Sequence, residues 1–233
     1  MLKEIRAERR AELVAAARRS AMADPAVQYP RWYLQRWHFL PEGYFSPRSV
    51  RWYERLIVPL YNMGRAANVY AAVSREIAVA EAMTIVQLGC GSGLGVEAVR
   101  KAFPAAEVVG VDLSPFMLEA ATARVGEGTE RARLIHADAR SIAMKTGGVD
   151  MVFAVHVLGH VPANVSDAMA EESARLLRPG GRMVVVDHRW HRLPETAGLF
   201  TESSRRPLVA GVLAMTVFER NVATALKCQR ERS

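Results

Sequence analysis

Three glycines at alternate positions form the most distinctive short motif of this chain. Residues 89–93 read GCGSG, and they lie between an apolar run at 84–88 and a stretch that reads as a helix from residue 94. Glycines spaced in this way allow a tight turn and let a ligand approach the backbone closely. The helix that follows would add free N–H donors and a partial positive charge at its start. The motif therefore predicts a ligand-binding loop.

Two aspartates stand where they could complete such a site. Asp112 ends a second apolar run about 20 residues after the loop, where a carboxylate can accept hydrogen bonds from both hydroxyls of a ribose. Asp138, within the sequence HADA at 136–139, ends a third run and could accept a hydrogen bond from an adenine amino group. Ligands of open α/β sheets bind at the carboxyl ends of the strands, and both aspartates fall there.

Histidines follow the next apolar run. His156 and His160 are one helical turn apart if their segment is helical, so they could share a face. Either could act as a general base at neutral pH, and both are candidate catalytic residues. The alternative for each is a role in packing. Asp187 and His188 follow a fifth apolar run, and with the first two histidines they include suitable metal-ligand types. Sequence spacing does not establish a metal site, and none is predicted.

Apolar runs and helical stretches alternate from residue 84 onward. Strands are predicted at 84–88, 108–111, 133–136, 151–155 and 183–186, and helices at 94–103, 115–125 and 167–177. This alternation implies crossover connections and a parallel sheet that is buried on both faces. The expected fold class is α/β, with a doubly wound, mostly parallel, Rossmann-like sheet. One edge of that sheet would carry the glycine loop, the aspartates and the histidines.

An N-terminal helical cap is expected over residues 1–82. Helices are predicted at 1–22, from Pro47 after an N-cap at Ser46, and at 63–79. Residues 29–70 hold eleven of the seventeen aromatic residues, which could form a lid that stacks on a planar or lipid-like molecule. The candidates for substrate contact are Tyr29, Trp32, Tyr33, Trp37, Tyr44 and Tyr53. Alternatively, these rings only pack the cap against the sheet.

The chain is least patterned after the fifth strand. Residues 83–188 form the expected α/β core, and residues 189–233 are expected to complete the fold as a C-terminal extension. Residues 189–206 read as a loop. Helix-forming residues after Pro207 favour a helix over 207–230, although the apolar run at 212–218 is also compatible with a strand.

These motifs together resemble those of the class I S-adenosylmethionine-dependent methyltransferases, over about residues 83–188. The sequence VQLGCGSG at 86–93 is similar to their first motif, GVDLS at 110–114 to their ribose motif, HADA to their adenine motif, and RPGG at 178–181 to the turn before their fifth strand. A nicotinamide-binding Rossmann domain fits less well, because it gives no reason for the adenine motif and the RPGG turn to be present.

The resemblance implies that S-adenosylmethionine is the cofactor. The residues it assigns to cofactor binding are Gln87, Gly89, Cys90, Gly91, Gly93, Asp112, Leu113, Asp138, Ala139 and Val155. Gln87 departs from the family pattern, since most members have a carboxylate there that helps to hold the amino acid part of the cofactor. The tail is a second departure, because the family usually ends in an antiparallel pair of strands that residues 207–230 do not clearly supply.

The function implied is methyl transfer to a small, aromatic or apolar acceptor such as a quinone or a secondary metabolite. A related enzyme that modifies quinones by transferring a group other than methyl is one alternative. It rests on Gln87 and on the segment that contains Val50, Arg51 and Tyr53, which is loosely similar to the rhodoquinone-biosynthesis branch of the superfamily. A non-catalytic regulatory module that keeps the cofactor is the other alternative.

Charge and cysteine content limit which partners and which compartment the sequence predicts. The net charge is +7, and Lys and Arg outnumber Asp and Glu in residues 1–82 and 189–233 but not in residues 83–188. The basic flanks are compatible with a solvated surface, with an acidic substrate, or with peripheral contact at an anionic membrane. No nucleic-acid recognition motif accompanies the charge, so nucleic acid is not an expected partner, while a homodimer is compatible with the sequence. Two cysteines and no secretory or membrane-spanning segment predict a cytoplasmic protein.

Overall fold

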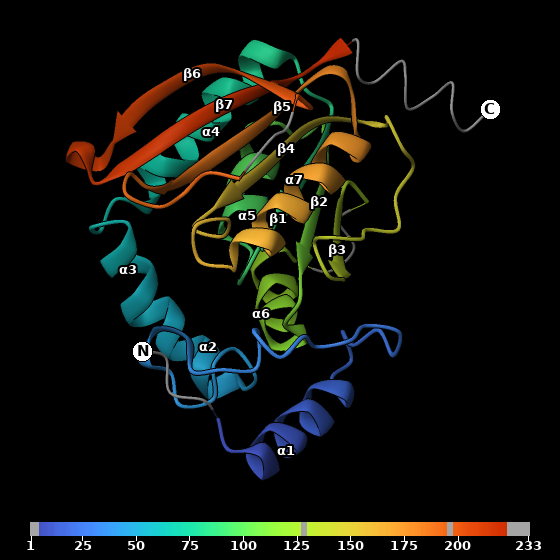
Figure 1. Ribbon diagram of the computed structural model, residues 1–233, viewed down its shortest axis with the longest axis vertical. Coiled ribbons are helices and arrows are strands. Elements are labelled where there is room, and N and C mark those ends of the chain that lie inside the picture. The colour runs from blue at the N-terminus through green and yellow to red at the C-terminus, as the bar shows by residue number, and fades with distance from the viewer. Residues whose placement is uncertain (1–4, 127–129, 195–197, 223–233) are drawn as a thin grey trace.

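The computed structural model describes residues 5–126, 130–194 and 198–222 and is built on one seven-stranded sheet (Figure 1). The strand order is β3-β2-β1-β4-β5-β7-β6, and β7 runs antiparallel to both of its neighbours. The strands are β1 (Thr84–Leu88), β2 (Glu107–Asp112), β3 (Ala132–His136), β4 (Val149–Val155), β5 (Leu177–His188), β6 (Phe200–Leu208) and β7 (Leu213–Arg220). The mostly parallel α/β class expected from the sequence is confirmed.

Helices cover both faces of the sheet, as crossover connections require. One face carries α4 (Ala66–Ala80), α5 (Leu94–Ala102) and α6 (Pro115–Val125), which share a core cluster with the strands. The other face carries α7 (Ala163–Leu176), whose Val165, Met169 and Ala170 pack in a second cluster. The strands are rich in valine and isoleucine and are buried on both sides, so each apolar run reads as a strand from its sequence.

The cap lies across the carboxyl ends of the strands (Figure 1). It contains α1 (Ala7–Arg18), the short turn η1 (Trp37–Phe39), α2 (Pro47–Trp52), the π-helical turn η2 (Tyr53–Ile57) and α3 (Val58–Tyr61). The predicted N-cap is confirmed, because the Ser46 side chain accepts a hydrogen bond from the N–H of Ser49. The first helix is shorter than the predicted range of 1–22, of which residues 1–4 lie outside the described residues.

The helix predicted at 63–79 is α4, and it belongs to the sheet layer. Val69, Val73 and Ile77 are fully buried in the cluster that α5 and the strands share. The lid over the strand ends is therefore made by the chain before α4, although the predicted cap extended to residue 82.

The helix favoured over residues 207–230 is not found where the structure describes this segment. Residues 200–208 and 213–220 instead form β6 and β7, which pair antiparallel along their lengths. Leu213, Met215 and Val217 are buried in one core cluster and Phe218 in the other, so burial on both faces of the strand outweighs the helix-forming residues around it. The antiparallel pair that the sequence did not clearly show is thus present. Residues 223–233 lie outside the described residues.

No helix in the described part of the chain is long and apolar enough to cross a membrane.

Candidate functional site

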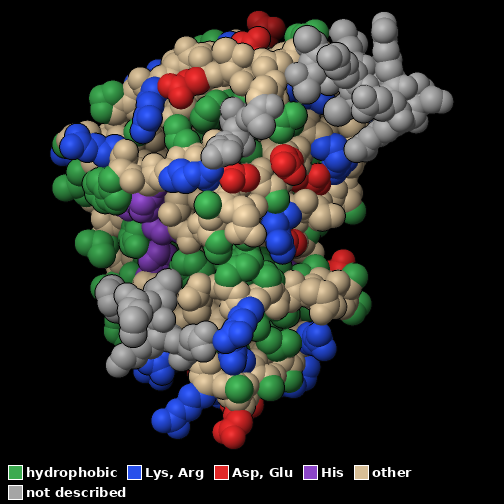
Figure 2. All heavy atoms as spheres, viewed as in Figure 1, with side chains coloured by type: hydrophobic (Ala, Val, Ile, Leu, Met, Phe, Trp, Pro, Cys, Tyr) green, Lys and Arg blue, Asp and Glu red, His purple; other side chains and the backbone are tan. Residues whose placement is uncertain are grey.

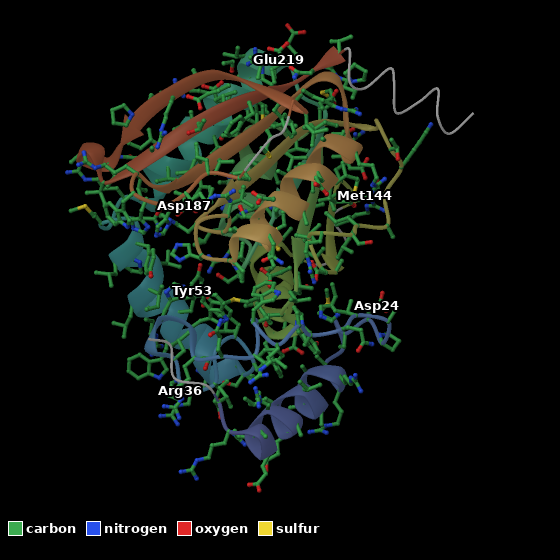
Figure 3. The ribbon with its side chains drawn as sticks, viewed as in Figure 1. Asp24, Arg36, Tyr53, Met144, Asp187 and Glu219 are labelled. Atoms are coloured by element: carbon green, nitrogen blue, oxygen red, sulfur yellow. The ribbon has the colours of Figure 1, made fainter. Side chains whose placement is uncertain are left out.

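A pocket lies between the carboxyl ends of the central strands and the cap. Its floor comes from the ends of β1, β2 and β4 and from the loops that follow them, and its roof comes from aromatic side chains of the cap. Figure 3 shows Tyr53 on the cap and Asp187 at the end of β5 on facing sides of this region. The pocket and its open mouth together enclose about 810 Å³ of empty space, which includes solvent at the mouth.

The glycine loop connects β1 to α5 and needs its glycines for different reasons. Gly89 and Gly91 have φ angles of 58° and 53°, and both line the pocket. A Cβ at Gly89 would lie 2.6 Å from Val157, so no side chain fits there. Gly93, with a φ of 82°, does not line the pocket, and a Cβ there would lie 2.9 Å from the Ala121 backbone in α6. The first two glycines therefore open the pocket floor, and the third permits close helix packing.

Asp112 ends β2 and lines the pocket directly beside this loop. Its Oδ2 accepts a hydrogen bond from the N–H of Gly91 at 2.8 Å, and its Oδ1 accepts one from the N–H of Ser114 at 2.8 Å. Burial raises the pKa of the Asp112 carboxyl to about 6, against the opposing effect of these N–H donors. At neutral pH the group is a fixed carboxylate with unused acceptor capacity facing the pocket.

The other residues expected around the adenine and ribose lie in the same wall. Leu113, Asp138, Ala139 and Val155 all line the pocket. The Asp138 carboxylate also holds the Arg140 guanidinium, with an N–O distance of 2.6 Å. This ion pair fixes the position of the Asp138 side chain, which also lines the pocket.

Besides Gly93, two further residues assigned to the cofactor by resemblance, Gln87 and Cys90, lie away from the pocket lining. Gln87 is 1% exposed, its Oε1 has no hydrogen-bond partner, and its amide fills the space where a Cβ of Gly95 would otherwise lie. Cys90 is buried in the core cluster between α5 and the strands, and burial raises the pKa of its thiol. Gln87 thus packs against Gly95 at the start of α5, and Cys90 Sγ lies 3.8 Å from the carbonyl oxygen of Gly91 in the loop.

Five of the six aromatic substrate candidates line the roof of the pocket. They are Trp32, Tyr33, Trp37, Tyr44 and Tyr53. The rings also pack on one another, as in the parallel stack of Trp37 on Tyr44 with centroids 6.3 Å apart. The rings therefore pack the cap and line the pocket at the same time, and their contact with a substrate stays a prediction. Tyr29 does not line the pocket and contacts Phe45 and His136 instead.

His156 and His160 both line the pocket where β4 leads into α7. The segment is not a regular helix, since His156 has a φ of 56°, in the left-handed region that non-glycine residues seldom adopt. Their ring centroids lie 6.4 Å apart. Burial lowers the pKa of both imidazoles to about 4, so they are neutral at pH 7.

Asp187, near the end of β5, connects this strand to the segment that holds His156 and His160. Its Oδ2 accepts a hydrogen bond from the N–H of Gly159 at 2.8 Å, and its Oδ1 lies 2.7 Å from Nδ1 of His191. Burial acts to raise the pKa of Asp187, but the hydrogen bond from His191, the nearby ring of His160 and the Gly159 N–H outweigh it and leave the pKa below its ordinary value. Histidine side chains reach the surface at this junction of sheet and cap (Figure 2).

Three residues of the cap complete the histidine cluster and were not predicted as site residues. Tyr61 places its ring 5.0 Å from that of His188, and its hydroxyl is 2.7 Å from Nδ1 of His38. Asn62 is 4% exposed and contacts His156. They lie about a hundred residues before the segments they meet, and no spacing rule connects them. The aromatic enrichment at 29–70 was the one signal available.

Comparison with known protein families matches the strand-and-loop region of this site. Residues 85–181 match the family model described as a methyltransferase domain. Among curated proteins, the ubiquinone/menaquinone biosynthesis C-methyltransferase UbiE of Syntrophotalea carbinolica is 32% identical over 61% of this chain and 60% of its own length. Trans-aconitate 2-methyltransferase of an Azoarcus species is 35% identical over 51% of this chain and 46% of its own length. The chain thus spans about half the length of the curated relatives it matches.

Solved structures agree in fold. The PH0226 protein from Pyrococcus horikoshii is 15% identical and superposes with a TM-score of 0.59 over 73% of this chain and 99% of its own. The N-methyltransferase NodS of Bradyrhizobium japonicum, solved with S-adenosylhomocysteine, is 16% identical with a TM-score of 0.53 over 67% of this chain and 87% of its own. The chain therefore contains a methyltransferase domain over residues 85–181, and its glycine loop, Asp112 and strand order agree with the class I S-adenosylmethionine-dependent fold.

Proposed function

We propose that this protein binds S-adenosylmethionine and transfers its methyl group to a small, planar and largely apolar acceptor. The observation that carries the proposal is the composition of the pocket. One wall is the glycine loop with Asp112, and the facing wall is a set of aromatic rings from the cap. A methyl donor on the first wall and an acceptor on the second would lie side by side, which is the arrangement that methyl transfer by positioning needs.

The residues present fit the cofactor. Gly89 and Gly91 line the pocket, and a Cβ at Gly91 would already lie within 3.9 Å of the Tyr53 ring. Asp112 offers carboxylate oxygens to ribose hydroxyls, and Leu113 and Ala139 offer an apolar surface to a base. When bound, S-adenosylmethionine supplies an electrophilic methyl group on a sulfonium. The chain's own part is to fix the donor at this loop and to exclude water with the aromatic roof.

The acceptor is assigned from the cap. Trp32, Trp37 and Tyr44 form a wall of flat apolar surface, which favours stacking on a planar molecule over binding of a highly charged one. The named relatives act on acceptors as different as quinone precursors and trans-aconitate, and the aromatic wall supports the quinone-like class. His156 and His160 lie at the acceptor end of the pocket. A pKa near 4 makes each a weak general base at neutral pH, so we assign them to contact with the acceptor.

Calorimetric titration with S-adenosylmethionine and with S-adenosylhomocysteine tests the cofactor assignment. We expect micromolar binding that the Gly91→Arg variant abolishes, because the larger side chain would fill the pocket floor. Release of S-adenosylhomocysteine in the presence of a reduced quinone, compared with trans-aconitate, then tests the acceptor class, and mass spectrometry of the quinone distinguishes methyl from amino transfer. A folded protein that binds neither nucleoside would overturn the proposal. Cofactor binding without transfer to either acceptor would favour a regulatory module.

We also propose that the cap docks on an anionic membrane surface. The continuous helical segment from α2 to α3 exposes Trp52, Leu56 and Leu60, which are 47%, 53% and 70% exposed and recur every four residues. The exposed Arg51 and Arg55 lie on the same segment. An apolar stripe flanked by arginine is the pattern by which a helix lies in the interface of an anionic bilayer. Tyr53 on the inner side of this segment lines the pocket, so docking would bring the pocket to a lipophilic acceptor.

A further inference from the structure

Four side chains from two strand ends bring potential metal ligands together beside the pocket. They are His156, His160, Asp187 and His188, and one donor atom from each lies within 4.8 Å of the others. That separation is little more than twice the zinc–nitrogen distance of about 2.1 Å, so one ion could contact all four after small side-chain rotations.

Three of these side chains present an imidazole nitrogen with nothing to bind. Nδ1 of His156, Nε2 of His160 and Nδ1 of His188 are all buried without a hydrogen-bond partner. Buried polar atoms are nearly always paired, because an unpaired one costs on the order of 1–3 kcal/mol. Three such atoms in one cluster are placed to bind one shared ligand. A metal ion fits, because it accepts the lone pair of an unprotonated imidazole nitrogen.

A contact with Asn62 determines which ring nitrogen of His156 carries the proton. Asn62 donates from Nδ2 to the carbonyl of Val58 at 2.8 Å, so its Oδ1 is the acceptor that faces Nε2 of His156 at 3.2 Å. The proton of His156 is therefore on Nε2, and the lone pair is on Nδ1. A hydrogen bond of this kind orients metal-binding histidines and sets their tautomer.

The backbone of His156 and the carboxylate of Asp187 are also placed to form a ligand site. His156 keeps its strained left-handed φ of 56° while its N–H donates to the carbonyl of Val186 at 2.8 Å, and strain of this kind concentrates at functional sites. Asp187 supplies the negative charge, with its Oδ1 3.6 Å from Nε2 of His160 and 3.8 Å from Nδ1 of His188. Three further hydrogen bonds, from His191 and from the N–H groups of Gly159 and His188, fix the carboxylate in place.

We propose that His156, His160, Asp187 and His188 bind a divalent transition-metal ion. Three imidazoles and one carboxylate suit Zn²⁺ best, or another first-row ion that accepts nitrogen ligands, rather than Mg²⁺ or Ca²⁺. The rings of Tyr61 and Trp190 lie against His188, with centroid distances of 5.0 and 4.8 Å, and would cover one side of the site.

The role of the ion in catalysis rests on the proposed function, although its binding does not. Since His156 and His160 also line the pocket, the ion would stand at the acceptor end. A hydroxyl oxygen of the acceptor that binds the ion would have a lowered pKa, and its proton would leave to solvent water.

Metal analysis of the purified full-length protein tests the site. We expect about one equivalent of bound Zn²⁺ or a related ion after purification without chelator. We also expect that protein treated with chelator takes up Zn²⁺ in calorimetry and shows the absorption bands of Co²⁺ bound to nitrogen when Co²⁺ is added. His156→Gln and His188→Gln should each weaken Zn²⁺ binding at least tenfold, and Asn62→Ala by a smaller factor. His136→Gln is the matched control, because it removes a buried histidine outside the cluster.

Titration with S-adenosylhomocysteine in parallel separates this proposal from the proposed function. A folded wild-type protein that binds the nucleoside but neither Zn²⁺, Co²⁺ nor Mn²⁺ would overturn the metal site alone. Equal Zn²⁺ affinity in the wild type and in the double variant His156→Gln with His188→Gln would do the same, since the ion would then bind elsewhere. Loss of binding in His136→Gln to the same extent would also count against the site.

Discussion

The buried carboxylate of Asp112 should make the affinity for the cofactor depend on pH. Burial raises its pKa to about 6, so the carboxylate begins to take up a proton as the pH falls through this value. The protonated form has lost the charge that strengthens hydrogen bonds from ribose hydroxyls. We expect the affinity for S-adenosylhomocysteine to be constant from pH 7 to 8 and to fall as the pH drops below about 6. Calorimetry at a series of pH values checks this.

The Asp112→Asn variant isolates the charge from the shape of the side chain. It should bind S-adenosylhomocysteine about 10- to 100-fold more weakly at pH 7.5, since hydrogen bonds to charged groups contribute about 1.5–3 kcal/mol. It should also lose the pH dependence near 6. A variant that keeps the same decline below pH 6 would show that another group is responsible.

Arg124 of α6 joins three elements around the glycine loop. Its Nε donates to the carbonyl of Ser92 at 2.9 Å, and its guanidinium forms an ion pair with Glu54 of η2 and lies 3.8 Å from Glu97 of α5. We expect Arg124→Met to lower the free energy of unfolding by about 1–2 kcal/mol, because the buried carbonyl loses its donor. Affinity for S-adenosylhomocysteine should fall as well, since the loop loses this attachment. Denaturant unfolding and calorimetry measure the two effects.

Arg131→Met is the comparison for Arg124→Met. Arg131 also donates to a backbone carbonyl, that of Ala105 at 2.9 Å, but it is exposed and distant from the pocket. Its replacement should change the free energy of unfolding by no more than about 0.5 kcal/mol and leave nucleoside binding unchanged. Similar effects in the two variants would argue against a link between cap and loop through Arg124.

The sequence predicted well those helices and strands whose conformation is determined by their own residues. Strands such as β1 and β4 are apolar runs bounded by turn residues, and α6 begins at Pro115 after the N-cap Ser114, as its sequence indicates. The strand β7 was predicted less well, because its state depends on pairing with β5 and β6 rather than on its helix-forming residues.

The candidate site likewise has residues whose position the sequence predicted and residues whose position it did not. Asp112 and the glycine loop follow strands directly, so their position at the sheet edge could be read from the order of elements. The placement of Gln87 against the start of α5 depends on the space left by Gly95, which a sequence motif does not show. The histidine cluster needs Asn62 to meet His156 across 94 positions, and such long-range contacts are set by tertiary packing alone.

The whole molecule places a basic, apolar surface on the outside of the same helical segment that roofs the pocket. Val50 and Ile57 on its inner side are buried, whereas Trp52, Leu56 and Leu60 are exposed. A protein that only needed a lid would gain nothing from exposing these apolar side chains, and large exposed apolar patches usually mark contact surfaces. Together with Arg51 and Arg55, the exposed stripe favours binding at an anionic bilayer over binding at a neutral one.

Sedimentation with lipid vesicles tests this surface in the intact protein. We expect binding to vesicles that contain phosphatidylglycerol, weaker binding to pure phosphatidylcholine, and a decrease as salt screens the arginines. The double variant Leu56→Ser with Leu60→Ser should bind at least tenfold more weakly, because burial of each leucine contributes about 1.5–3 kcal/mol. The matched control is Val79→Ser with Met83→Ser, which removes two apolar residues that are 68% and 52% exposed elsewhere. Equal losses in the two double variants, or no binding to the anionic vesicles, would contradict a docking role for the cap.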